Sequence, residues 1–114
     1  MIIEFYDFGE MVVNGKRYLR DLIITPSRII PNWWRKEGHR LCLEDLKEVL
    51  DEQVDAVVLG TGYYGLVKVE DEVIDYFESR GIRVIVKPTC EAVREFNNLV
   101  SQGRKVLGAF HLTC

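Results

Sequence analysis

The spacing of apolar residues changes near residue 43, and this change constrains the fold more than any other feature of the sequence. Before it, short apolar runs at residues 2–6, 11–13 and 21–25 are separated by turn residues. After it, helical spacings of three and four residues alternate with short continuous apolar runs. The resulting order, α-β-α-β-α-β, is typical of a largely parallel sheet with helical crossovers.

Three apolar stripes predict the helices, and three apolar runs predict the strands between them. The strands are expected at residues 57–59, 82–86 and 106–110. Thr89 is expected to be the N-cap of the third helix, and Gly81 and Gly103 follow the second and third helices as terminating residues. The stripes are Leu43, Leu46 and Leu50; Val69, Val73 and Phe77; and Val93, Phe96 and Val100.

The N-terminal part predicts antiparallel hairpins. Asn14-Gly15 lies between two β-rich runs and readily supplies the two positive φ angles of a type I′ turn. Pro26 ends the next strand because proline has no amide to donate. The expected fold is therefore an α/β structure with a largely parallel sheet, to which the hairpins add either antiparallel strands or a small second sheet. The helices come from the C-terminal two thirds, and residues 1–114 form one domain.

Charge and cysteine usage narrow the possible functions. The net charge is −3, which argues against bulk nucleic-acid binding. Residues 14–40 carry seven basic and two acidic residues, whereas residues 41–80 carry eleven acidic and three basic ones. The three cysteines indicate reduced thiols rather than a disulfide framework. No targeting or membrane-spanning segment is recognisable, so a cytoplasmic location is expected.

Gly60-Thr61-Gly62 follows an expected strand and, with Gly65, matches the G-x-G-x-x-G spacing of dinucleotide-binding turns. The next strand ends without an acid that could hold a ribose, and acidic residues 70–72 would repel a phosphate. A tight structural turn is therefore the preferred interpretation. The alternative is a small-molecule or anion pocket between residues 60–62 and Thr89, with Arg104 as a less certain neighbour.

Cysteine and histidine give no convincing catalytic or metal site. Cys90 would lie at the start of the third helix, where a thiol can be activated, but no partner base is placed beside it. His39 and Cys42 share a His-x-x-Cys spacing with His111 and Cys114. Ligands at that spacing in a strand point to opposite faces, so we expect no metal and no cofactor.

The strongest candidate for a binding surface is Trp33-Trp34 with Arg35, Lys36 and His39. Neighbouring residues of an extended chain face opposite ways, so at most one tryptophan should belong to the core. The other would anchor a protein interface. Stacking on single-stranded nucleic acid is a further reading, which the acidic net charge disfavours.

Short motifs spread over nearly the whole chain point to a known family. They are Trp34, Gly38-His39, Glu44-Asp45-Leu46, Leu59-Gly60-Thr61-Gly62, Pro88-Thr89, Ala92, Asn97, Leu99, Gly103-Arg104 and His111-Leu112-Thr113-Cys114. With these residues the chain resembles a family of small α/β domain proteins that includes the mitochondrial complex I assembly factor three and the adipogenesis-associated domain protein. The resemblance implies a three-layer α/β fold with a central mixed, mostly parallel sheet and action through protein binding, and it implies no known reaction. We therefore expect an assembly-factor-like binding module with an unidentified protein partner.

Overall fold

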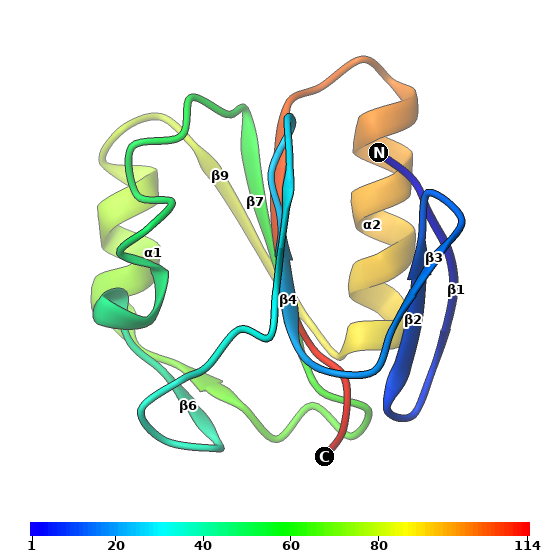
Figure 1. Cartoon of the computed structure of the whole chain (residues 1–114). Helices are drawn as coiled ribbons and strands as arrows, with labels where there is room; N and C mark the ends of the chain where they lie inside the picture. Colours follow the sequence, from blue (N-terminus) through cyan, green and yellow to red (C-terminus); the bar gives the residue numbers. More distant parts are fainter.

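A computed structural model describes all residues from 1 to 114. Ten strands, two α-helices and one short 3₁₀ helix follow one another along the chain (Figure 1). In chain order they are β1 (Ile3–Asp7), β2 (Glu10–Val13), β3 (Lys16–Tyr18), β4 (Leu22–Ile24), β5 (Ile29–Pro31), β6 (Arg40–Leu41), η1 (Leu43–Leu46), β7 (Ala56–Thr61), β8 (Lys68–Val69), α1 (Asp71–Glu78), β9 (Arg83–Lys87), α2 (Thr89–Ser101) and β10 (Val106–His111).

The central sheet has five strands in the order β5-β4-β10-β7-β9. Strands β10, β7 and β9 are parallel, and β4 and β5 add an antiparallel hairpin at the side of β10. Strands β1, β2 and β3 form a separate antiparallel sheet. The expected mixed sheet with N-terminal hairpins is therefore confirmed, and only the β4–β5 hairpin joins the main sheet.

The helices cover opposite faces of the central sheet (Figure 1). On one face α2 and the small sheet pack together, and Phe96 meets Phe110 edge-on with ring centroids 5.7 Å apart. On the other face α1, η1 and the turns after η1 bury Phe77, Leu46 and Val49 against the sheet. Strands β7 and β10 are buried along their whole length because each is covered from both sides.

The first predicted helix is wrong as an α-helix. Residues Leu43–Leu46 form a 3₁₀ helix, and a series of i to i+3 hydrogen bonds continues as turns to Glu52. The fully buried side chains are Leu46 and Val49, three residues apart, whereas Leu50 is only half-buried. That spacing suits the three residues per turn of a 3₁₀ helix.

Two predicted helix starts also differ. Val69 belongs to β8, which pairs with β6, so the second helix begins at Asp71. Thr89 is the first residue of α2 and Pro88 is its N-cap. The Thr89 hydroxyl does not cap the helix because it bonds to the ends of β7 and β10 instead.

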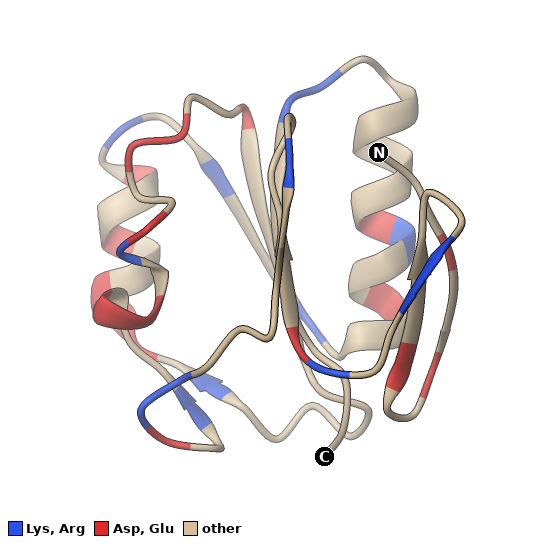
Figure 2. Ribbon diagram, in the orientation of Figure 1, with Lys and Arg blue, Asp and Glu red and all other residues tan.

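The acidic residues of the expected charge asymmetry lie mainly in one region of the fold. Figure 2 shows acidic residues gathered on α1 and on η1 with the turns that follow it. The basic residues are more dispersed, and Arg17, Arg35 and Arg40 are paired with carboxylates. Neither helix combines the length and the apolar character needed to cross a membrane.

Candidate functional site

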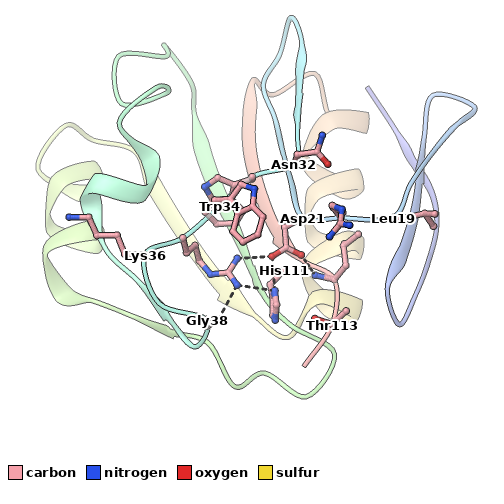
Figure 3. Close-up of a pocket in the computed structure, with 12 residues that line it drawn as sticks. Leu19, Asp21, Asn32, Trp34, Lys36, Gly38, His111 and Thr113 are labelled. Atoms are coloured by element: carbon pink, nitrogen blue, oxygen red, sulfur yellow. Dashed lines mark hydrogen bonds and ion pairs between the residues drawn. The ribbon is translucent and has the colours of Figure 1, made fainter.

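A cavity of about 430 Å³ lies beyond the carboxyl end of β10. Three separate segments line it, at residues 19–21, 32–38 and 111–113, without Glu37. Figure 3 shows Asp21, His111 and Trp34 near the centre of this group, with Lys36 and Leu19 at its two sides. Open α/β sheets commonly bind ligands at the carboxyl ends of their parallel strands, so this cavity is the candidate site.

Asp21 and His111 form the floor of the cavity as a tightly bonded pair. Strand pairing places them together, because β4 and β10 are antiparallel and Leu22 lies opposite Phe110. Asp21 precedes Leu22 and His111 follows Phe110, so the two residues come next to each other at the end of the pairing. The distance between His111 Nδ1 and Asp21 Oδ2 is 2.7 Å, and the Leu112 amide donates to Asp21 Oδ1 at 2.9 Å. A carboxylate accepts but does not donate, so the ring must carry a proton on Nδ1.

Arg35 completes a buried cluster with this pair. Its guanidinium donates to Asp21 Oδ2 at 2.8 Å and to the Gly38 carbonyl at 3.0 Å, and its side chain is only 5% exposed. It also stacks over the Trp33 ring at 5.1 Å. Because His111 Nδ1 already carries a proton, its 3.0 Å approach to Arg35 is a contact between two donors and not a hydrogen bond.

The cluster sets the ionisation of Asp21. Burial alone would raise the pKa of this carboxyl. Hydrogen bonds from His111, Arg35 and the Leu112 amide outweigh that effect and lower the pKa below its ordinary value of 3.8. Asp21 is therefore a permanent anion at neutral pH, and it fixes both the tautomer and the orientation of the histidine ring.

The two tryptophans separate as expected. Trp33 is buried, and its indole Nε1 donates to the Asp45 carbonyl at 2.8 Å. Trp34 is 79% exposed, and it lies between the cavity at Asp21 and a second cavity of about 440 Å³ on its other side. Asn32, with a φ of 55°, turns the chain just before this pair.

The glycine turn at residues 60–62 lies next to Thr89 as expected, but a direct hydrogen bond joins the two. The Gly62 amide donates to Thr89 Oγ1 at 2.9 Å, and the Tyr63 amide donates to the Thr113 carbonyl. A Cβ atom at Gly60 would lie 2.8 Å from the Phe110 ring. The glycines therefore permit close packing at this point, and these two amides are not available to an anion.

The other predicted site residues are dispersed. Thr61 is buried and donates from its hydroxyl to the Lys87 carbonyl. Arg104 follows the C-terminal end of α2, at the opposite end of that helix from Thr89, so it cannot join the glycine turn. His39 is exposed and does not line the cavity. Nowhere do three or more His, Cys, Asp or Glu side chains gather as they would around a metal ion.

Sequence reasoning missed Asp21 and the role of His111, which lie 90 residues apart in the chain. It also missed an exposed aromatic cluster in which Tyr63 contacts Phe8 and Tyr64, with ring centroids 5.6 and 5.1 Å apart. The two tyrosines occupy the spacer positions of the glycine motif, and the motif carries no information about side chains there. Asp21 and His111 come together only because β10 pairs with β4, and no local sequence pattern signals that strand pairing.

The fold and the site define a small α/β domain with a mixed sheet and a ligand-sized cavity at the carboxyl end of its central strand. Residues 3–111 match the family described as "Protein of unknown function (DUF498/DUF598)", and the chain belongs to this family. The expected family resemblance is thereby confirmed.

Among its relatives are curated proteins named NADH dehydrogenase [ubiquinone] 1 alpha subcomplex assembly factor 3. The human protein is 31% identical over 112 residues, and the bovine protein is 30% identical over the same length. Each alignment covers 96% of this chain and 59% of the relative, so the chain spans a little over half of their length. The crystal structure of a conserved hypothetical protein from Pyrococcus horikoshii OT3 is 32% identical, with a TM-score of 0.88 and complete coverage of both chains.

Proposed function

We propose that this chain is a protein-binding module with an assembly-factor-like role, and that it binds its partner through the surface around Trp34. The observation that carries the proposal is the 79% exposure of the Trp34 side chain on a firmly held backbone. Tryptophan is the residue type most enriched among the dominant contacts of protein interfaces. Its exposure leaves a large apolar surface in water, which a partner would cover.

Hydrogen bonds on both sides of Trp34 hold its backbone in place. The Trp33 amide donates to the Asp21 carbonyl at 2.8 Å, and the Lys36 amide donates to Asp45 Oδ1 at 3.0 Å. The buried Trp33 side chain anchors the same segment to the core. A partner that packs on Trp34 therefore loses little free energy to ordering this loop.

The charge around Trp34 indicates the chemistry of the partner. Arg20 and Lys36 line the cavity, and neither makes an ion pair within the chain. Arg35, by contrast, is neutralised by Asp21 and lies below the surface. A protein surface with an apolar centre and acidic residues at its rim would complement Trp34 and the two free cations.

The curated relatives support a role in protein binding because their names describe assembly factors. Nothing in the buried cluster or in the glycine turn requires a reaction to account for it. The partner of this chain need not be the complex named for those relatives, because the chain spans only 59% of their length.

Site-specific photocrosslinking in the cell of origin would test this proposal. A photoreactive amino acid at Lys36 should capture one protein, whereas the same group at Glu91, on the exposed face of α2, should not. The Trp34→Ala variant should abolish this crosslink. With the purified partner, Trp34→Ala should weaken binding by about 2 kcal/mol, or roughly thirtyfold, and added salt should weaken it further.

The matched control is Tyr64→Ala, because Tyr64 is 65% exposed and belongs to the separate aromatic cluster. It should leave the crosslink at Lys36 unchanged. If Tyr64→Ala removes the interaction while Trp34→Ala does not, the partner binds at the other surface and the proposed interface is wrong. Capture of nucleic acid in place of protein would also overturn the proposal.

A further inference from the structure

The floor of the cavity is more elaborate than a protein contact at Trp34 requires. Arg35 Nε is the single buried side-chain nitrogen or oxygen that lacks a hydrogen-bond partner. The Nε2 atom of His111 also has no partner in the chain, so it must be reached by solvent. The ionic cluster therefore leaves one nitrogen of His111, a residue that lines the cavity, without a partner in the chain.

Asp21 determines what this free nitrogen can do. Because the Nδ1 proton is donated to Asp21 at 2.7 Å, the neutral ring has its lone pair on Nε2. The ring cannot rotate easily, since Asp21 is itself held by Arg35 and by the Leu112 amide. His111 therefore presents a fixed hydrogen-bond acceptor to a ligand that carries an N–H or O–H group.

The mouth of the cavity offers two further recognition elements. Trp34 presents its indole ring beside the Asp21–His111 pair (Figure 3). Arg20 lines the same cavity and has neither an ion pair nor a hydrogen bond within the chain. An aromatic face suits a planar ring, and a free guanidinium suits a carboxylate. The volume of about 430 Å³ lies within the range of pockets for small molecules.

We propose that this cavity binds a small aromatic carboxylate that also carries a hydrogen-bond donor. The ring stacks on Trp34, the carboxylate pairs with Arg20, and the donor bonds to His111 Nε2. This ligand site goes beyond the proposed protein-binding function, because it needs no partner protein. Since both sites use Trp34, a bound ligand would compete with a partner at that surface.

Calorimetric titration with simple probes tests the inference on the purified chain alone. 4-Hydroxybenzoate has the ring, the carboxylate and the donor, and it should bind once per chain with a dissociation constant of about 1 mM or lower. 4-Methoxybenzoate lacks the donor and 4-hydroxybenzyl alcohol lacks the carboxylate. Each should bind about tenfold more weakly, because one polar group of the site is then left without its partner.

Two substitutions at exposed positions test which side chain of the protein binds the carboxylate, and neither removes a core residue. Arg20→Gln should weaken 4-hydroxybenzoate about tenfold, whereas Lys47→Gln removes an equal charge outside this cavity and should change nothing. Nitrogen-15 NMR of the imidazoles should show the probe shifting His111 Nε2 while Nδ1 stays protonated. The chain has two histidines, so a His39→Gln variant assigns the spectrum.

Three results would overturn the inference: no saturable binding of 4-hydroxybenzoate, equal affinity for the methoxy analogue, or equal affinity in the Arg20→Gln variant. None of them bears on the protein-binding proposal, since the crosslinking experiment is performed without the probe. Conversely, a failed crosslink leaves the titration result unaffected. The two proposals can therefore be rejected separately.

Discussion

The hydroxyl of Thr89 donates a 2.6 Å hydrogen bond to the backbone carbonyl of His111. The same oxygen accepts a 2.9 Å hydrogen bond from the Gly62 amide. The first residue of α2 thus joins the carboxyl ends of β7 and β10, and it supports the histidine that forms part of the cavity floor.

Replacing Thr89 by Val should destabilise the fold by about 3 kcal/mol, because two buried backbone groups lose their partner in a side chain of similar shape. Urea denaturation followed by circular dichroism would measure this. The Thr89→Ser variant retains the hydroxyl and should cost only about 1 kcal/mol for the lost methyl group. Equal losses in both variants would show that the hydroxyl bonds contribute little.

Gly62→Ala should destabilise the chain far more than Gly103→Ala. Both glycines have positive φ, at 103° and 81°, so both substitutions carry a backbone cost of about 1 kcal/mol. At Gly62 the new Cβ would also lie 2.8 Å from His111 Cδ2 and from the Thr113 carbonyl oxygen, whereas nothing lies within 4 Å at Gly103. Thermal melts of the two variants, measured side by side, isolate the steric effect.

The neighbouring tryptophans should respond in opposite ways. Trp33→Ala removes a buried ring and its hydrogen bond to Asp45, and it should cost about 3–5 kcal/mol. Trp34→Ala removes an exposed ring and should change the free energy of unfolding by less than about 0.5 kcal/mol. Denaturant titration of both variants tests this, and a large loss in Trp34→Ala would place that ring in the core.

Asp21 should make the chain sensitive to acid. Its folded pKa lies below 3.8, so the unfolded chain binds the proton more tightly. The stability from Asp21 is present above pH 3.8 and is lost as pH falls through the lower folded pKa. At pH 6 the Asp21→Asn variant should be about 3–5 kcal/mol less stable, because Arg35 then keeps a buried, unpaired charge. Unfolding curves between pH 6 and pH 2 should show this difference shrinking below about pH 4.

Tyr6 should ionise late in alkali. Burial raises the pKa of its hydroxyl from 10.0 to about 12. The neutral hydroxyl donates to the Leu112 carbonyl at 3.0 Å. The resulting stability is present below pH 10 and is lost as pH rises toward 12. Ultraviolet titration of tyrosinate should show one late component, which the Tyr6→Phe variant should lack.

The order of helices and strands was predictable because the spacing of apolar residues along the chain depends on the local secondary structure. The parallel strands and both α-helices follow from the apolar spacing after residue 43. The Asn14-Gly15 turn was predictable from a second local rule, since both residues readily adopt the positive φ angles that the turn needs. The short 3₁₀ helix at Leu43–Leu46 was misread because a helix of one turn gives too few apolar positions to separate a period of 3.0 from 3.6.

The candidate site was predictable only in part. Trp33 and Trp34 were recognised because alternation of an extended chain is a local rule. Arg35 was expected at the surface, but the structure buries its side chain, because Asp21 neutralises it there. Asp21 and His111 meet through the pairing of β4 with β10, which depends on the whole topology and not on nearby residues.

The place of β10 in the sheet has a consequence for the order in which this chain can fold. It is the last strand in sequence, yet it lies between β4 and β7 and separates the antiparallel hairpin from the other parallel strands. Until β10 emerges from the ribosome, the two halves of the sheet have no shared strand and expose unpaired edges. We therefore expect the sheet to close late and slowly during synthesis, because its central pairing joins distant parts of the chain.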